Sequence, residues 1–368
     1  MASGRVPITL IILIKRVVLI FEGRKILIIS LTRTGSIEYA AALANKLSKY
    51  NPLIISSEEA AHIFDYVDYQ LETYSGKLSF IIKSLTIRRQ IDKLLGPIKM
   101  KHDKLTIIFP VFHPWNNVIA QWAKKTNTKL VTVIHDFKMH LGEGSRTIEK
   151  LQNDLILLSD KIIFLTKSER DKALKVRCDL NEKTFVLPHP ILKTNLKNNM
   201  AHSSQLKLLF VGRISKYKGI ELLLDAAVDL EYDVLTIAGQ GDLPKSKNLK
   251  SSKIDFINRR LDPQEIEKLL ATHHVLILPY IDASQSGILT LGLDSNIPMI
   301  ITDHEGLKEQ LNSHTAIWCK TDSEGLKQGI EEYANNPQKY RDVKNRMREF
   351  KKEFDDRWEM KAKELFSL

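Results

Sequence analysis

The sequence predicts an α/β protein of two doubly wound, Rossmann-like domains whose parallel sheets face each other across a cleft. Short aliphatic runs alternate with amphipathic helical segments, which is the pattern of βαβ units. A polar stretch, KTNLKNNMAHSSQ at 193–205, interrupts the alternation once, and the alternation then restarts. The length of 368 residues exceeds one ordinary core and fits two domains.

In the first half, short runs rich in Ile, Leu and Val predict strands, and the longer amphipathic segments between them predict helices. This alternation predicts a mostly parallel sheet, because each helix would cross from one strand to the next. The expected strands are 25–31, 52–57, 105–111, 130–136, 161–166 and 184–190, and the expected helices are 36–50, 118–126 and 167–174.

The second half repeats the pattern after the polar stretch. It opens with LKLLFVGR and closes with a long charged helix that starts near Asn336. Ligands of such sheets bind outside the carboxyl ends of the strands, so a site is expected in the cleft between the halves. The expected strands are 206–213, 233–239, 253–258, 275–280 and 298–302, and the expected helices start at Gly219, at Asp262 and after Gly287.

The composition leaves several kinds of partner open. The net charge of +11 suits nucleic acid, an anionic membrane or phosphorylated substrates. No basic motif interleaved with aromatic residues is present, so no nucleic-acid partner is expected. The segment 77–101 mixes apolar and cationic residues, which suits adhesion to anionic lipid or an ordinary helix with a solvated basic face.

Cysteine usage and the N-terminus bear on the compartment. Cys178 and Cys319 show no metal or redox spacing and indicate a reducing, cytoplasmic setting. The aliphatic run 8–21 is interrupted by Lys15 and Arg16, is shorter than a membrane span, and lacks a small-residue cleavage site. This N-terminal extension is therefore an added strand or helix, a monotopic membrane element, or a leader upstream of the true start.

The first candidate site is the stretch FVGRISKYKGIELLLDA at 210–226. Gly212 follows an apolar run, so Arg213 and Lys218 are expected on the loop at the carboxyl end of a strand. Arginine offers a planar fork of donors and lysine a point charge, a combination that suits a diphosphate. The alternative is a strand–loop–helix turn whose charges face water.

The second candidate site lies in LPYIDASQSGILTLGLDS, where a polar loop precedes an apolar helix that starts after Gly287. The free amides at such a helix start favour an anion. Ser284, Gln285 and Ser286 would supply neutral hydrogen bonds to sugar or phosphate oxygens. The alternative is N-capping of the helix by Ser284 or Ser286, which requires no ligand.

Two further places carry chemistry in the first half. His135 and Asp136, followed by His140, end the strand of TVIHDFKMH and could serve acid–base chemistry or cap the local backbone. Metal is not expected, because no third ligand stands at plausible spacing. In SLTRTGSIEYAA, Gly35 would allow close approach by a ligand, but a G-x-G-x-x-G dinucleotide fingerprint is missing.

In this order, the segments resemble the retaining GT-B glycosyltransferases of glycosyltransferase family 4. FVGRISKYKGIELLLDA is similar to the family's G-R…K-G phosphate clamp, and IPMIITDHEGLKE to its G-x-P-V-I-x-T-D-x-G-G-x-x-E segment. In the first half TRTGSIEYAAALANKL, VTVIHD, KIIFLTKSE and FVLPHP follow the family order. The resemblance covers roughly residues 24–320, is specific in the second half and is looser in the first.

The resemblance implies a role for each matching residue. Arg213 and Lys218 would bind the donor diphosphate, and His135, with Asp136 beside it, would lie at the reaction centre. The family's first glutamate falls at Ser284 and its second near Gly292, where Asp294 is the nearest acid, so the glutamate pair is replaced by an S-Q-S-G variant. The implied donor site comprises Gly35, Gly212, Arg213, Lys218, Ser284, Gln285, Ser286, Gly287 and Asp294, with no metal and no cofactor.

The resemblance also implies the domain plan and the activity. A GT-B chain would place an acceptor domain at 24–195, a donor domain at 196–345, and a helix at 346–368 that returns to the first domain, after the extension 1–23. The expected activity is hexosyl or glycosyl transfer from a nucleotide-diphosphate sugar to a lipid-linked or glycan acceptor in cell-surface polysaccharide biosynthesis, at the inner face of the membrane. The alternative is a catalytically silent protein of the same fold that binds nucleotide sugars.

Overall fold

The computed structural model describes residues 24–33, 36–138, 145–228, 230–242 and 252–366, which form two parallel-sheet domains joined by a linker. The expected N-terminal extension at 1–23 lies outside these residues. The first sheet has the strand order β3-β2-β1-β4-β5-β6-β7, and every pairing in it is parallel. Its strands are β1 (Lys25–Ser30), β2 (Leu53–Ser57), β3 (Tyr69–Leu71), β4 (Leu105–Phe109), β5 (Lys129–Ile134), β6 (Lys161–Phe164) and β7 (Thr184–Val186).

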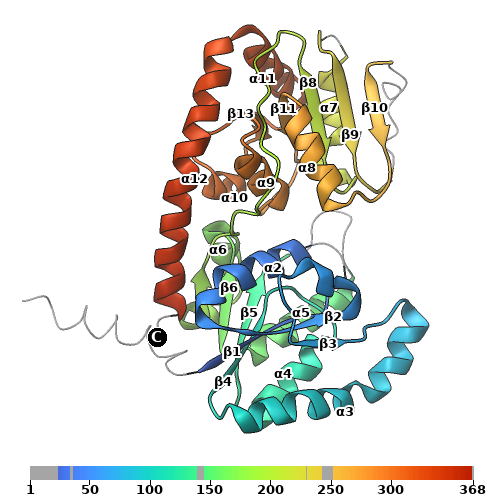
Figure 1. Ribbon diagram of the computed structural model, residues 1–368, viewed down its shortest axis with the longest axis vertical. Coiled ribbons are helices and arrows are strands. Elements are labelled where there is room, and N and C mark those ends of the chain that lie inside the picture. Colours follow the sequence, from blue (N-terminus) through green and yellow to red (C-terminus); the bar gives the residue numbers. More distant parts are fainter. Residues whose placement is uncertain (1–23, 34–35, 139–144, 229, 243–251, 367–368) are drawn as a thin grey trace, which may run out of the picture.

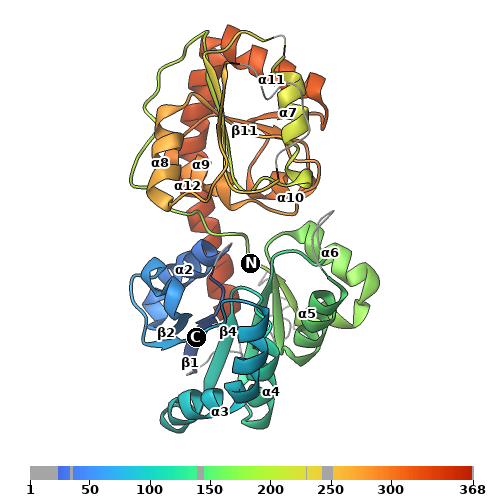
Figure 2. The same cartoon turned by 90° about the vertical axis from the view of Figure 1, so that its right-hand side faces the viewer.

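Helices cover both faces of the first sheet. α3, α4 and α5 pack in a row on one face, and α2 packs on the other (Figures 1 and 2). β4 is buried along its whole length because it lies mid-sheet between these layers. The helices are α2 (Ile37–Lys46), α3 (Lys77–Lys101), α4 (Asn116–Lys125), α5 (Arg146–Leu158) and α6 (Lys167–Val176), with 3₁₀ turns at Ser48–Tyr50, Glu58–Ile63 and Cys178–Lys183.

The second sheet is also parallel, in the order β10-β9-β8-β11-β12-β13. α7 and α11 pack on one face, and α8 and α9 on the other (Figure 2). Its strands are β8 (Lys207–Val211), β9 (Val234–Ala238), β10 (Ile254–Ile257), β11 (Val275–Leu278), β12 (Met299–Thr302) and β13 (Ile317–Cys319); its helices are η4 (Lys216–Lys218), α7 (Ile220–Ala226), α8 (Pro263–Thr272), α9 (Gly287–Ser295), α10 (Glu305–Gln310) and α11 (Ser323–Asn335).

The last helix, α12 (Pro337–Phe366), runs alongside both domains (Figure 1). Near its C-terminal end it contacts the first domain, where Lys46 Nζ lies 2.9 Å from the Asp355 carboxylate. The Trp358 indole donates to the Pro188 carbonyl at 2.8 Å. The expectation of two doubly wound domains with a terminal helix crossing back to the first domain is therefore confirmed.

Some elements were not expected from the sequence. β3 and β13 have three residues each, too few to show a periodic pattern. α5 and α11 are full helices capped by Ser145 and Asp322, whose side chains accept from the amides of Ile148 and Gly325. Among the described residues, no helix is both long and apolar enough to cross a bilayer.

Candidate functional site between the two domains

The loop after β8 places Arg213 and Lys218 at the carboxyl end of the second sheet. Gly219, the N-cap residue just before α7, has φ of +65° and faces the chain just after β11. A β-carbon there would overlap the Pro279 carbonyl, so only glycine allows this approach. The loop is thereby held against the central strand of its sheet.

Two tyrosines hold the cations of this loop. The Arg213 guanidinium donates to the Tyr217 hydroxyl at 3.0 Å, and the Lys218 ammonium lies 3.7 Å from the centre of the Tyr280 ring. Tyr217 and Tyr280 are buried, whereas Arg213 is exposed and Lys218 is half-buried. A buried aromatic ring beneath a partly solvated cation restricts the rotamers of that cation and fixes the position of its charge.

The three polar residues of the S-Q-S-G stretch have different environments. Ser286 caps α9: its hydroxyl accepts from the Leu289 amide at 3.3 Å, and its own amide donates to Gln310 at 2.7 Å. The capping alternative is therefore correct for Ser286. Gln285 is half-buried, and its side-chain oxygen has no hydrogen-bond partner within the described part of the chain. Such an oxygen is expected to accept from a ligand or water.

Ser284 reaches across to the first domain. Its hydroxyl donates to the carboxylate of Asp136, which lies just beyond the end of β5. The Asp136 carbonyl in turn accepts from Gln152 of α5 at 2.9 Å. The structure thus brings together Ser284 and the His135–Asp136 pair, although they are far apart in the sequence.

His135 has one ring nitrogen engaged and one available. Nε2 lies 2.9 Å from the Pro110 carbonyl, which can only accept, so Nε2 carries the proton. Nδ1 is then an acceptor, and it has no partner among the described residues. Burial lowers the pKa of His135, against the opposing effects of the Pro110 bond and the Asp136 charge. A neutral imidazole with a free acceptor nitrogen can orient a hydroxyl group.

Tyr39 and His189 belong to the same site but were not among the expected residues. The Tyr39 ring meets the rings of His135 and His189 edge-on, with centroids 4.6 and 5.0 Å away. Burial raises the pKa of Tyr39, whose hydroxyl has no partner in the described chain, and lowers the pKa of His189 to about 3. His189 also lies next to Gly287, at the start of α9. The sequence signal was the histidine of FVLPHP, a stretch that begins within β7 and continues past its end.

Asp294 lies in a different environment from the one expected. It is buried, with its carboxylate bound by the Thr194 amide at 2.8 Å, by Lys197 of the linker, and by Lys351 of α12 at 2.5 Å. These bonds tie α9 to the linker and to α12. Asp294 is therefore a structural ion-pair centre here, and the structure gives it no contact with the loop of Arg213 and Lys218.

Position 292, near which the second family glutamate falls, is tightly packed. A β-carbon on Gly292 would lie 2.8 Å from Leu276 Cδ2 and 2.9 Å from Met299 Sδ. Both neighbours are fully buried core side chains. A side chain at position 292 would therefore require Leu276 and Met299 to shift.

Glu309 makes a second contact between the domains. Its carboxylate accepts from the amides of Lys167 and Ser168, the latter at 2.7 Å, at the N-terminus of α6. A carboxylate at this end of a helix satisfies free amides and interacts favourably with the helix dipole. The sequence pointed to Glu309 only as the last residue of the motif IPMIITDHEGLKE.

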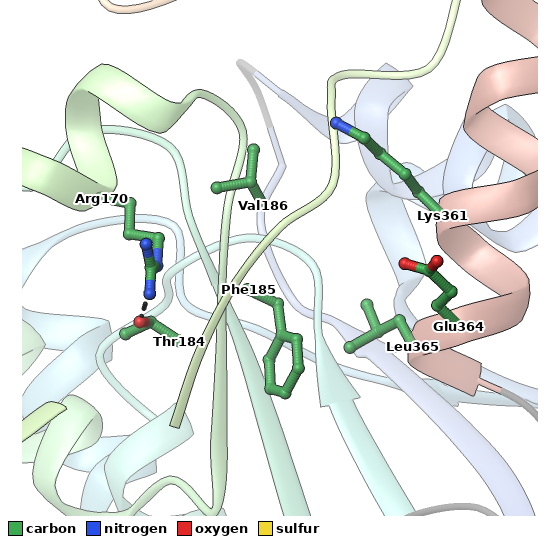
Figure 3. A pocket seen from close by; sticks show the side chains of 7 residues that line it. All are labelled: Arg170, Thr184, Phe185, Val186, Lys361, Glu364 and Leu365. Carbon is green, nitrogen blue, oxygen red and sulfur yellow. Dashed lines mark hydrogen bonds between the residues drawn. The ribbon is translucent and has the colours of Figure 1, made fainter. Parts of the chain in front are cut away.

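Other features lie away from this site or outside the described residues. Gly35 and His140 fall outside the residues that the structure describes. A cavity of about 280 Å³, shown in Figure 3, lies where β7 and α6 meet the end of α12. The residues that line this cavity are Arg170, Thr184, Phe185, Val186, Lys361, Glu364 and Leu365.

In the described ranges no three His, Cys, Asp or Glu side chains gather to hold a metal ion.

Comparison with known families identifies the second domain. Residues 205–336 match the family described as "Glycosyl transferases group 1". The second domain is similar to this group. The match includes the loop of Arg213 and Lys218 and the whole S-Q-S-G stretch, so the resemblance to a group 1 glycosyltransferase is confirmed. No curated protein matches the chain.

Solved structures confirm the GT-B fold. Anabaena Alr3699/HepE in complex with UDP and glucose has a TM-score of 0.71 at 15% identity, covering 94% of this chain and 100% of that one. Sucrose-phosphate synthase from Thermosynechococcus elongatus has a TM-score of 0.70 at 14% identity, covering 93% and 98%. A structure from Listeria monocytogenes, described as a UDP-N-acetylglucosamine 2-epimerase, has a TM-score of 0.60 at 14% identity, covering 87% of this chain and 90% of that one. Identities this low establish the fold alone.

Proposed function

We propose that this glycosyltransferase moves a sugar from a nucleotide-diphosphate donor to a lipid-linked or glycan acceptor, with retention of configuration. The observation that carries the proposal is the pair Arg213 and Lys218, held on tyrosines inside the matched domain and at the carboxyl ends of the strands. Two cations at this edge of a doubly wound sheet suit the diphosphate of a donor. UDP-sugars are the first donors to test, because the HepE structure is a complex with UDP and glucose.

Each residue then has a chemical role. The bond from the sugar's anomeric carbon to the diphosphate breaks, and the bond to the acceptor oxygen forms on the same face. The acceptor's proton passes to the departing phosphate oxygen. Arg213 and Lys218 neutralise the negative charge that grows on the diphosphate, so no metal is required. Nδ1 of His135 accepts a hydroxyl hydrogen bond and positions the reactants.

The neutral residues of the second domain would hold the donor sugar. Gln285 is half-buried, and its buried side-chain oxygen, without a protein partner in the described chain, would accept a hydrogen bond from a sugar hydroxyl. Gly212, after β8, and Gly287, at the start of α9, have no side chain and would let the donor approach the backbone closely. The expected setting is the cytoplasmic face of a membrane, in the synthesis of a cell-surface glycan.

The proposal is tested by a donor screen with matched variants. Wild-type protein is incubated with UDP-, GDP- and ADP-sugars while nucleotide release and thermal stabilisation are measured. Arg213→Gln and Lys218→Gln should each lower kcat/KM for the preferred donor by about 10²–10³, as loss of a transition-state charge partner does. Lys216→Gln, in the same loop and exposed, should stay within about twofold.

Two outcomes would contradict the proposal. Unchanged turnover in both clamp variants would remove the diphosphate assignment. Nucleotide-dependent stabilisation without turnover would support the alternative, a catalytically silent protein of this fold that binds nucleotide sugars. The observation in favour of that alternative is the missing glutamate pair at 284 and 292. Product analysis by NMR separates transfer from epimerisation, which the fold also accommodates.

A further inference from the structure

The first two turns of α3 carry exposed apolar side chains, which we call the outer row. Leu78, Ile81, Ile82 and Leu85 are 72%, 59%, 57% and 81% exposed. Their spacing of i, i+3, i+4 and i+7 places them on one face of the helix. A contiguous apolar patch on a soluble surface marks an interaction site more often than scattered single residues do.

The outer row plays no part in holding α3 to its domain. The opposite face of the helix buries Ile87, Ile91, Leu95 and Ile98 against the sheet. At 100° per residue the two faces lie roughly 130° apart around the axis. The helix is further fixed by the Trp115 indole, which donates to Ser84 at 2.9 Å. The outer row can therefore change without loss of the core.

Cations follow the apolar side chains on the same helix. Residues 77–101 contain seven Lys or Arg and a single acid, Asp92. Arg89 and Lys93 continue the line of Leu85 at i+4 and i+8, and both are exposed. Beyond the helix end, Arg24, Lys25, His102 and Lys104 line an open cavity with Asp103. An apolar strip that runs into positive charge is complementary to an anionic bilayer.

The position of α3 relates the outer row to the cleft. The helix connects β3 to β4, which are parallel, so it runs back from the carboxyl edge of the sheet to its amino edge. Its first turns, with the outer row, therefore lie toward the carboxyl edge of the first sheet. Figure 1 shows α3 starting at the side of this domain and ending beneath it.

We propose that the outer row inserts into an anionic bilayer while Arg89 and Lys93 contact its head groups. This inference extends the proposed function, because it would set the mouth of the cleft beside a lipid-linked acceptor. The docking itself depends only on α3, since it requires neither donor nor catalysis. An apolar strip of this size holds a protein at the interface reversibly.

Vesicle co-sedimentation of the full chain tests the proposal. Vesicles are pure phosphatidylcholine or phosphatidylcholine with 30% phosphatidylglycerol, at 0.1 and 0.5 M salt. Wild type should bind the anionic vesicles and weaken at high salt. Leu78→Gln/Ile82→Gln/Leu85→Gln should lower the partition constant at least tenfold. Arg89→Gln/Lys93→Gln should lower it about 25-fold, at about fivefold per cation.

Matched controls lie elsewhere on the surface. Leu157→Gln/Met360→Gln removes exposed apolar side chains of α5 and α12, and Arg346→Gln/Lys352→Gln removes exposed cations of α12. These should bind vesicles like wild type. UDP-sugar binding by every variant, measured separately, reports on the proposed function alone.

Three outcomes would overturn the proposal. Wild type that stays in the supernatant with both vesicle types has no membrane affinity. Variants of α3 that bind like their controls would move the contact to another surface. A dimer, detected by light scattering and abolished by the outer-row variant without vesicle binding, would make α3 an interface between copies of the chain.

Discussion

Asp294→Asn tests whether the buried carboxylate on α9 is structural. Burial has the largest single effect on the pKa of Asp294 and raises it, but the bonds from Lys197, Lys351 and the Thr194 amide together outweigh burial and lower the pKa to about 2. The ordinary value is 3.8. At about 1.4 kcal/mol per pKa unit, this difference means that the ionised form stabilises the fold by ~2.5 kcal/mol.

The expected loss for Asp294→Asn is ~2–3 kcal/mol of the free energy of unfolding at pH 7. Truncating a fully buried ion pair costs about 3–5 kcal/mol. Here the side chains of Lys197 and Lys351 are 44% and 27% exposed, so both can rehydrate once the carboxylate is gone. Urea unfolding followed by circular dichroism measures the loss. The exposed pair Asp303–Lys308 offers a control, and Asp303→Asn should cost less than ~1 kcal/mol.

The pH dependence of unfolding provides a second test of the role of Asp294. Because the folded pKa is below the unfolded one, the stabilisation is complete above about pH 5 and is lost as the pH falls through 3.8 toward 2. The gap between wild type and Asp294→Asn should therefore narrow over this range. The KM for the donor should not change. A variant with unchanged stability and a raised donor KM would refute the structural role and restore Asp294 to the donor site.

Two further predictions concern the domain contact and the loop. Glu309→Gln should weaken the contact with the α6 amides by ~1–2 kcal/mol and raise the radius of gyration in small-angle scattering. Glu305→Gln, on the same helix, should leave the radius of gyration unchanged. The same radius of gyration for Glu309→Gln and wild type would exclude a role of Glu309 in closure. Gly219→Ala should lower the free energy of unfolding by more than ~2 kcal/mol and abolish donor binding, because the new methyl overlaps the Pro279 carbonyl. Gly96→Ala, in open space within α3, should leave stability unchanged or raise it. Equal stability of the two variants would contradict this geometry.

Much of the fold was predictable because each domain is built from repeated local patterns. Buried parallel strands such as β4 and β11 are continuous aliphatic runs, and their neighbouring helices show helical periodicity. The edge strands β3 and β13 have only three residues, too few for any pattern to emerge. The N-cap Ser145 with apolar residues at helical spacing could have revealed α5.

The candidate site was predictable only in part, because its contacts join distant segments. Arg213 and Lys218 share one loop, so their spacing could be recognised directly. Asp294 has a carboxylate and a place near the expected glutamate, yet its partners Lys197 and Lys351 come from other elements and decide its role. Tyr39 and His189 flank His135 from α2 and from the segment after β7, and no local pattern links the three.

The replacement of the family glutamate at 284 and the presence of Asp136 are physically linked. The Ser284 hydroxyl contacts the Asp136 carboxylate across the domain interface. A glutamate at 284 would bring a second carboxylate toward Asp136, and the repulsion would raise one pKa or separate the domains. Serine instead donates a hydrogen bond and holds the two domains together at the mouth of the site. In the proposed donor site, neutral groups such as Gln285 would then recognise the sugar, and Arg213 and Lys218 would bind the diphosphate. Under the proposed function, the S-Q-S-G variant would therefore change how the sugar is recognised and how the cleft closes, while Arg213 and Lys218 would still bind the diphosphate.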